Sequence, residues 1–240
     1  MSPGPGTLYL IPVPIADGTA AAAVPPEVQE RTRTLGYFIV EQPKSARAFL
    51  KAIGHPGPLA DIRIARLEAG ADETRLLELL APVRQGADAG VLSEAGAPAV
   101  ADPGAMLVRH AHASGLRVAP LVGPSAMLLA LMASGLEGQR FAFHGYLPVD
   151  ERELKAELRA LEADSRRARR TELFIETPYR NDRLLRVITE TCAPGTWLCV
   201  AADLTSPGES IATRTVAEWR ASPRAIGRRP AVFLLLAAPR

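Results

Sequence analysis

Short apolar runs alternate with segments of helical hydrophobic period along the first half of the chain, and this alternation restricts the fold more than any other feature. Runs of four to six residues suit buried strands, and a helix between two of them lets consecutive strands lie parallel. The predicted strands are 7–11, 37–40, 62–67, 89–92 and 117–122, and the predicted helices are 26–35, 45–53, 72–84, 104–114 and 125–134. The pattern predicts an α/β domain with a mostly parallel sheet and helices on both faces.

The second half of the sequence has a different order of elements. These are a strand over 141–146, a helix over 151–169, a strand over 172–175, a helix over 181–192, and strands over 197–201, 210–214 and 231–236. Strands that follow one another without a long helix indicate antiparallel pairing, so we expect a mixed sheet in a second, α+β domain. Glycines within 134–140 suggest the linker, which places the domains at residues 1–136 and 137–240.

Composition excludes several classes of protein. The chain has 28 Lys and Arg against 26 Asp and Glu, a net charge of +2, which is too balanced for a protein that coats nucleic acid or a membrane surface. Cys192 and Cys199 have no metal-ligand or C-x-x-C spacing, so we expect no metal site and a reducing cytoplasm. No window approaches the roughly 18 apolar residues of a membrane span, and we expect neither a signal peptide nor a membrane segment.

Three loops after predicted strands of the first domain are candidates for a ligand site, because ligands of open α/β sheets bind beyond the carboxyl ends of the strands. The loops are 12–14, 93–98 and 121–126. Pro12 and Pro14 lack the N–H groups that a phosphate cradle needs, so the first loop suits a ligand that offers hydrogen-bond donors. An equally good interpretation is that Pro12 and Pro14 only stiffen the chain where it leaves the strand, with no role in ligand binding.

Polar residues near these loops have structural as well as functional interpretations. Glu94, among small residues that allow a ligand to approach, is as consistent with a solvated charge as with a ligand contact. Ser125 is placed to cap the next helix, and for Asp102 helix capping is the preferred interpretation. His144 lies on an alternating strand, which favours a structural role over that of a base.

Four segments, taken together in their order and spacing, resemble the tetrapyrrole methylase superfamily of S-adenosylmethionine-dependent methyltransferases, on the branch near the ribosomal RNA small-subunit cytidine 2′-O-methyltransferase. They are Gly6-Thr7-Leu8-Tyr9 through Pro12, Ser93-Glu94-Ala95-Gly96-Ala97-Pro98 with Asp102-Pro103-Gly104, Gly123-Pro124-Ser125-Ala126, and Glu176-Thr177-Pro178-Tyr179-Arg180. The resemblance covers essentially the whole chain. It implies a two-domain tetrapyrrole-methylase-like fold, a homodimer, and S-adenosylmethionine bound in a cleft between the domains.

The resemblance also implies which residues contact the methyl donor. They are Pro12, Ser93, Glu94, Ala95, Gly96, Val100, Ser125 and Ala126 in the first domain, and Glu176, Ala202 and Pro230 in the second. Methyl transfer from a sulfonium is an in-line displacement that depends mainly on holding the two reactants together, so it requires no strong catalytic group. A hydroxyl acceptor would gain from a general base, for which Glu94, Glu41 and His144 are the candidates.

The sequence leaves the methyl acceptor open between RNA ribose, a tetrapyrrole and another small molecule. The RNA enzymes typically show Ala-Glu-Asp-Thr-Arg where this chain has Val40-Glu41-Gln42-Pro43-Lys44, and Pro43 restricts Gln42 to extended geometry. A loop so changed predicts weak, salt-sensitive RNA binding at most and no efficient ribose methylation, although the arginines of 166–170 offer a local phosphate contact. A donor-binding regulatory protein without catalysis is the alternative from a different class.

Overall fold

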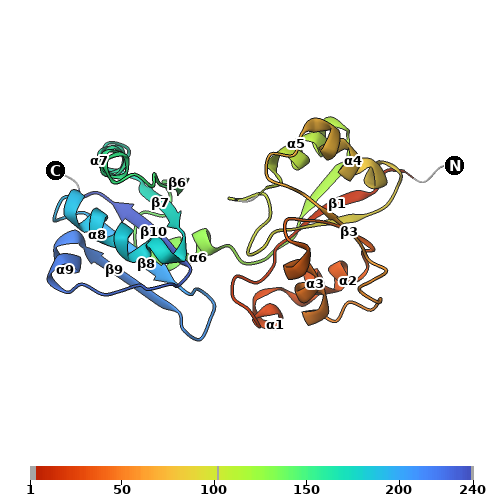
Figure 1. Ribbon diagram of the computed structural model, residues 1–240, viewed down its shortest axis with the longest axis horizontal. Helices are drawn as coiled ribbons and strands as arrows, with labels where there is room; N and C mark the ends of the chain where they lie inside the picture. Colours follow the sequence, from red (N-terminus) through yellow and green to blue (C-terminus); the bar gives the residue numbers. More distant parts are fainter. Residues whose placement is uncertain (1–3, 102, 239–240) are drawn as a thin grey trace. The chain divides into compact units, whose positions relative to one another are not determined.

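The chain divides into two compact units, Met1–Ser125 and Ala126–Arg240, in a computed structural model that describes residues 4–101 and 103–238 (Figure 1). The predicted domain boundary after residue 136 is wrong, because it assigns helix α6 (Ala126–Ser134) to the first unit. This helix buries Ala130 and Leu131 in a cluster with Leu173 and Leu234 of the second sheet. Its packing therefore places it in the second unit.

The first unit is built on a parallel five-stranded sheet of order β3-β2-β4-β1-β5, as predicted. Its strands are β1 (Thr7–Ile11), β2 (Tyr37–Val40), β3 (Arg63–Arg66), β4 (Ala89–Leu92) and β5 (Arg117–Pro120). Both β2 and β4 are buried along their whole length, which explains why they read as unbroken apolar runs. Since β4 lies between β1 and β2, the loops that follow these three strands leave the same edge of the sheet.

Helices cover both faces of this sheet (Figure 1). They are α1 (Ala20–Ala23), α2 (Pro26–Arg33) and α3 (Pro43–Ala52) on one face, and α4 (Glu73–Arg84) and α5 (Ala105–Ala113) on the other. Phe49 and Leu50 of α3 pack with Phe38 on the first face, whereas Leu79 of α4 and Leu107 of α5 pack with Ile39 on the second. Alternate side chains of β2 thus enter opposite layers, as the period of a strand requires.

The start of α3 differs from the helix predicted over 45–53, for which serine at position 45 is a common type of N-cap residue. The N-cap is Gln42, whose extended backbone (φ −126°, ψ 109°) agrees with the restriction that Pro43 imposes. Pro43 is therefore the first helical residue, and the Ser45 hydroxyl donates to the Gln42 carbonyl oxygen at 3.1 Å from inside the helix. The N-cap of α5 is Gly104, and Asp102 lies outside the described residues.

The second unit has a mixed five-stranded sheet of order β6-β7-β10-β8-β9, in which only β6 and β7 pair in parallel. Its strands are β6 (Phe141–Tyr146), β7 (Thr171–Glu176), β8 (Trp197–Ala202), β9 (Ser210–Thr215) and β10 (Ala231–Leu236). Its helices, besides α6, are α7 (Glu151–Ala168), the 3₁₀ turn η1 (Pro178–Arg180), α8 (Asn181–Thr191) and α9 (Val216–Ala221). The predicted mixed sheet and the α/β fold class are confirmed. No helix in the described part of the chain has the length and apolar character needed to cross a membrane.

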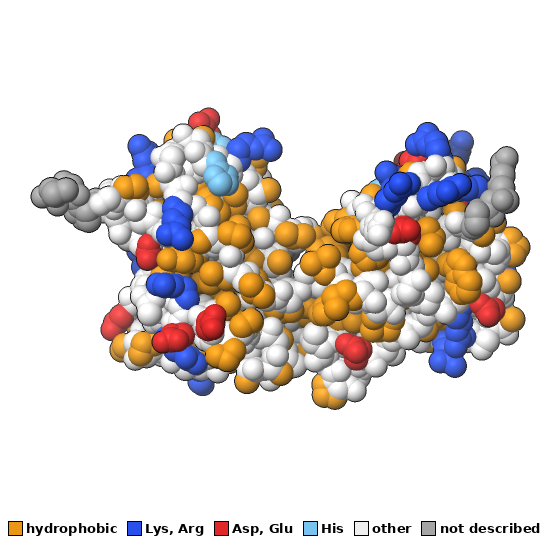
Figure 2. Space-filling model, turned by 180° about the vertical axis from the view of Figure 1, so that it is seen from behind, with side chains coloured by type: hydrophobic (Ala, Val, Ile, Leu, Met, Phe, Trp, Pro, Cys, Tyr) orange, Lys and Arg blue, Asp and Glu red, His pale blue; other side chains and the backbone are white. Residues whose placement is uncertain are grey.

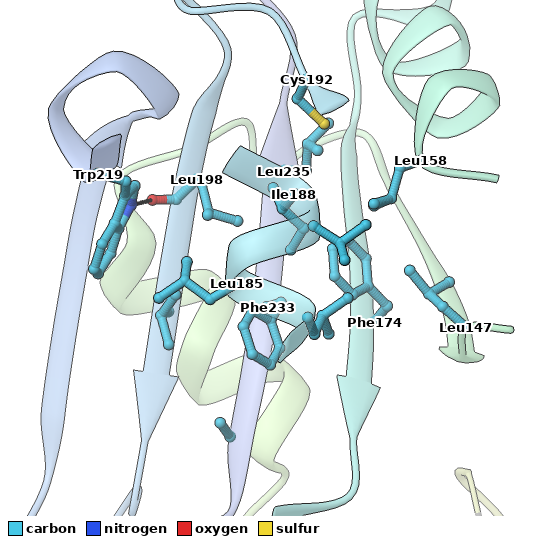
Figure 3. Close-up of a cluster of buried hydrophobic side chains, with 14 of the residues drawn as sticks. Leu147, Leu158, Phe174, Leu185, Ile188, Cys192, Leu198, Trp219, Phe233 and Leu235 are labelled. Atoms are coloured by element: carbon cyan, nitrogen blue, oxygen red, sulfur yellow. Dashed lines mark hydrogen bonds between the residues drawn. The ribbon is translucent and has the colours of Figure 1, made fainter. Parts of the chain in front are cut away.

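The main core of the second unit lies between its sheet and helices α7, α8 and α9 (Figure 3). Phe174 and Phe233 stack from neighbouring strands with ring centroids 5.8 Å apart. The Trp219 indole donates to the Leu198 carbonyl oxygen at 2.9 Å, which satisfies the one polar group of a buried ring. Cys192 lies in the same core as a free thiol, and burial raises its pKa to about 12. It behaves as a structural residue rather than a reactive one.

Candidate functional site

The loops after β1 and β4 are joined by a pair of backbone hydrogen bonds. The Val13 N–H donates to the Gly96 carbonyl oxygen at 2.9 Å, and the Gly96 N–H donates to the Val13 carbonyl oxygen at 3.1 Å. The hydroxyl of Ser93, a buried residue, donates to the same Gly96 oxygen at 3.2 Å. Two of the three loops predicted to bind a ligand therefore form one connected structure.

The third loop, 121–125, closes against the first. The Leu121 N–H donates to the Leu10 carbonyl oxygen at 2.9 Å, which continues the pairing of β5 with β1. Beyond it, Gly123 lies directly over Pro12: a Cβ atom at Gly123 would be 2.4 Å from the Pro12 Cβ. Pro12 is buried here, so its ring supports the neighbouring loop. We call these three joined loops (12–14, 93–96 and 121–125) the loop rim.

The two predicted base candidates, Glu41 and Glu94, lie next to each other at this edge of the sheet. Glu41 follows β2, and its N–H donates to the Leu92 carbonyl oxygen at 3.2 Å. Its carboxylate oxygen Oε2 accepts the Glu94 backbone N–H at 3.3 Å. Glu94 keeps an exposed side chain, whereas Glu41 is half-buried. The structure thus brings together one oriented carboxylate and one exposed carboxylate.

A cavity of about 270 Å³ opens beside Glu94, and sequence reasoning missed it. Small and apolar residues of the segment 13–21 form one wall, and one side of α3 forms another. Its polar groups are Asp17, Ser45, Ser93 and Glu94. This composition suits a neutral, partly apolar ligand that donates hydrogen bonds. We call it the α3 cavity.

The donor contacts predicted in the second unit also lie together. Ala231 of β10 pairs with Glu176 of β7 on one side and with Ala202 of β8 on the other, so strands that are distant in sequence meet at one end of the sheet. Pro230 precedes this position, and its carbonyl oxygen accepts the Asp203 N–H at 2.9 Å. Strand register alone therefore assembles Glu176, Ala202 and Pro230.

Glu176 is already engaged by its own chain. Its buried Oε1 accepts the Thr177 N–H at 2.6 Å and two guanidinium nitrogens of Arg180 at 2.9 and 2.5 Å. These bonds hold the 3₁₀ turn that begins at Pro178. Glu176 thus organises this turn whether or not it also contacts a ligand.

The remaining predicted site residues are placed as follows. Val100 is 46% exposed in the loop between β4 and α5, and Ala95 is exposed beside Glu94. Ser125 and Ala126 stand on either side of the division between the units, with Ala126 as the first residue of α6. Within the described ranges, no three His, Cys, Asp or Glu side chains are grouped as ligands for a metal ion.

His144 has a structural partner. Its Nε2 lies 2.6 Å from Glu172, a fully buried carboxylate that also bonds the Arg170 Nε at 2.7 Å. A cluster of basic side chains lies over α7 (Figure 2). Within 166–170, however, Arg167 pairs with Asp164 at 2.6 Å and Arg170 pairs with Glu172. Much of the positive charge that suggested a phosphate contact is therefore neutralised locally.

No protein family model matches the chain. It is 31% identical over 213 residues to "Ribosomal RNA small subunit methyltransferase I" of Xylella fastidiosa strain Temecula1, covering 89% of this chain and 74% of that protein. The protein of the same name from Escherichia coli O157:H7 is 30% identical over 213 residues, covering 89% and 70%. The solved structure of the methyltransferase CobJ matches 98% of this chain and 95% of its own, with a TM-score of 0.63 and 21% identity.

Proposed function

Because this chain belongs to the ribosomal RNA small subunit methyltransferase I family of the tetrapyrrole methylase superfamily, and is an S-adenosylmethionine-dependent methyltransferase, we propose that its methyl acceptor is RNA of the small ribosomal subunit. One observation carries the proposal: relatives named for this RNA align over 89% of the chain. The resemblance to CobJ supports the fold and does not identify an acceptor.

The loop rim is the proposed first-unit half of the donor site. S-adenosylmethionine offers an ammonium group, two ribose hydroxyls and an exocyclic amine as donors, and when bound it supplies an electrophilic methyl group. The rim offers acceptors for those donors, namely backbone carbonyl oxygens and the carboxylate of Glu94. Its 12–14 segment has few competing N–H groups, because two of its three residues are proline. The small, exposed Ala95 allows a ligand to approach the backbone of the 93–96 loop, whereas Gly96 is buried within the rim. The cluster of Glu176, Ala202 and Pro230 remains the predicted second-unit half.

Glu94 is the proposed general base for a hydroxyl acceptor, and Glu41 the proposed positioning residue. Glu94 has an exposed carboxylate at the mouth of the α3 cavity, where it can accept a proton from an acceptor in that cavity. The bond from the Glu94 N–H to Glu41 fixes the backbone from which this carboxylate extends. Most of the acceleration then comes from holding the acceptor in line with the methyl group, and the base adds a factor of about 10²–10⁴.

A homodimer in the cytoplasm is part of the proposal. The second unit exposes apolar side chains on α6 and β6, with Met132 78% exposed, Leu128 53% and Phe141 46%. These residues line a shallow cavity of about 420 Å³, and α6 has no charged residue. A contiguous apolar surface of this kind supports a protein interface.

Complementation tests the acceptor. Cells that lack their small-subunit methyltransferase of this family are given the wild-type chain, and methylation of the small-subunit RNA is mapped. We expect the wild-type chain to restore it and Glu94→Gln to restore much less. Isothermal titration in parallel should show S-adenosylmethionine bound at one site per chain. Normal donor binding without restored methylation would point to a different acceptor, or to a regulatory protein.

A further inference from the structure

Helix α3 carries a stripe of three exposed cations, Lys44, Arg47 and Lys51. Their spacing of three and four residues places them along one face of the helix. The stripe extends over about 10 Å at the usual rise of 1.5 Å per residue. It contains two of the three lysines of the chain, whose other basic residues are arginine apart from Lys155.

None of these three cations lies within 4.0 Å of a carboxylate in residues 4–101 and 103–238. Lys155, by contrast, pairs with Glu151 at 2.9 Å. The helix dipole favours Lys51, which stands in the last turn of α3. It does not explain Lys44, because Lys44 stands in the first turn, where the dipole disfavours a cation and no acidic residue offsets it. The stripe is thus uncompensated positive charge.

The stripe lies on the helix that forms one wall of the α3 cavity, and each of its cations directly precedes a residue of that wall in the sequence. The neighbouring side of the same helix contributes Ser45, Ala48, Phe49 and Ala52 to the cavity wall. Glu94 also lines this cavity, and Glu41 comes directly before the N-cap of the helix. A ligand whose negative charge follows the stripe would therefore place its adjoining groups at the cavity and the two carboxylates.

We propose that Lys44, Arg47 and Lys51 bind consecutive phosphates of a single-stranded RNA segment and direct one of its nucleotides into the α3 cavity; the proposal rests on the RNA acceptor proposed above. The cavity volume of about 270 Å³ suits one nucleoside-sized group. Its carboxylates repel phosphate but accept hydrogen bonds from base amino groups and ribose hydroxyls, so the polyanionic backbone stays outside on the cations. The strand must be single, because a stacked and paired nucleotide cannot enter a pocket.

The position of Lys44 in α3 removes one reason for expecting weak RNA binding. That expectation treated the altered Gln42-Pro43-Lys44 stretch as a loop that no longer holds a nucleotide. In the structure, Pro43 starts α3 and Lys44 is the first cation of the stripe. The Gln42-Pro43-Lys44 sequence thus lacks the loop motif of the RNA enzymes but contributes Lys44 to the basic stripe of α3.

The test is a salt titration of RNA binding by fluorescence anisotropy. The probe is a fluorescein-labelled single-stranded RNA of roughly 12 nucleotides, within the usual range of single-strand site sizes. The test variant is Lys44→Gln/Arg47→Gln/Lys51→Gln. The matched control is Arg84→Gln/Arg109→Gln/Arg117→Gln, which removes three exposed arginines from α4, α5 and β5 of the same unit. Both variants lower the net charge equally, and thermal unfolding confirms that each is folded.

We expect the stripe variant to lose roughly 100-fold in affinity at 0.1 M salt and its log–log salt slope to fall by about 2, because each single-strand phosphate contact contributes about 0.7 to that slope. The control should keep wild-type affinity. Equal behaviour of the two variants, no binding by the wild type, or equally tight binding of a duplex of the same length would overturn the proposal. If the wild-type enzyme methylates RNA but the stripe variant binds RNA as tightly as the wild type, the proposed function stands and only the role of the stripe is refuted.

Discussion

Replacing Gly123 by alanine should disturb the loop rim, because a Cβ atom at this position would lie 2.4 Å from the Cβ and 2.8 Å from the Cγ of Pro12. Carbon atoms in contact are separated by about 3.5–4.0 Å, so the proline ring or the Gly123 loop must move by about 1 Å. The backbone of Gly123 lies outside the left-handed region, and the effect is therefore steric. Overpacking of this kind costs roughly 1–3 kcal/mol of the free energy of unfolding.

The same 1 Å displacement would misalign the donor against its acceptor, for which we expect about a 100-fold lower kcat/KM for methyl transfer. Urea unfolding and a labelled-methyl transfer assay measure the two effects separately. Gly36→Ala is the matched control, since its Cβ meets nothing within 4 Å and no positive φ is involved. Wild-type stability and activity in Gly123→Ala would show that Pro12 and Gly123 do not shape the donor site.

Four further predictions test other parts of the account. Ala48→Trp, which fills the α3 cavity from an exposed position, should abolish methyl transfer while thermal unfolding stays unchanged; normal transfer would remove the cavity from the acceptor site. Met132→Glu should shift the mass measured by light scattering from twice 25.6 kDa to 25.6 kDa, and a monomeric wild type would contradict the dimer. Glu172→Ala removes the carboxylate partner of His144 and Arg170, and it should lower the free energy of unfolding in urea by roughly 3 kcal/mol. A decrease of less than about 0.5 kcal/mol would refute a stabilising role for Glu172. The Cys192 thiol has a pKa of about 12 in the folded protein and ionises near pH 9 in the unfolded chain. Above pH 9 the free energy of unfolding of the wild type should therefore fall, relative to that of Cys192→Ala, by about 1.4 kcal/mol per pH unit. A difference between the two proteins that stays constant with pH would contradict the burial of Cys192.

Strands β2, β4 and β10 could be predicted because burial on both faces leaves an unbroken apolar signal. β1, β2, β4, β6 and β10 have the predicted bounds, and neighbouring loops such as 12–14 and 93–96 could be assigned to one edge from topology alone. The prediction of α3 began two residues late because Ser45 is a common N-cap residue, whereas Pro43 is the residue that starts the helix. The helix α9 was missed, although the capping box of Thr215 and Glu218 is a readable signal.

The domain boundary and the α3 cavity could not be placed from sequence in the same way. The apolar sequence of α6 is compatible with packing on either sheet. Only its contacts with Leu173 and Leu234 assign it to the second unit. The cavity depends on the segment 13–21 lying against α3, a contact between distant segments that no local pattern records. The basic stripe did have a signal, the helical spacing of Lys44, Arg47 and Lys51. Its meaning depends on the adjacent cavity and on the absence of carboxylate partners in the part of the chain that the structure describes.

Transfer of a tritiated methyl group from S-adenosylmethionine tests the central claim most directly. The purified chain is incubated with the labelled donor and, separately, with total RNA, small ribosomal subunits and a cell metabolite extract. We expect label in the RNA of the small subunit and a large loss of that label in Glu94→Gln. Label confined to the metabolite extract would contradict the RNA acceptor, and no label in any of the three, despite donor binding, would contradict methyl transfer itself.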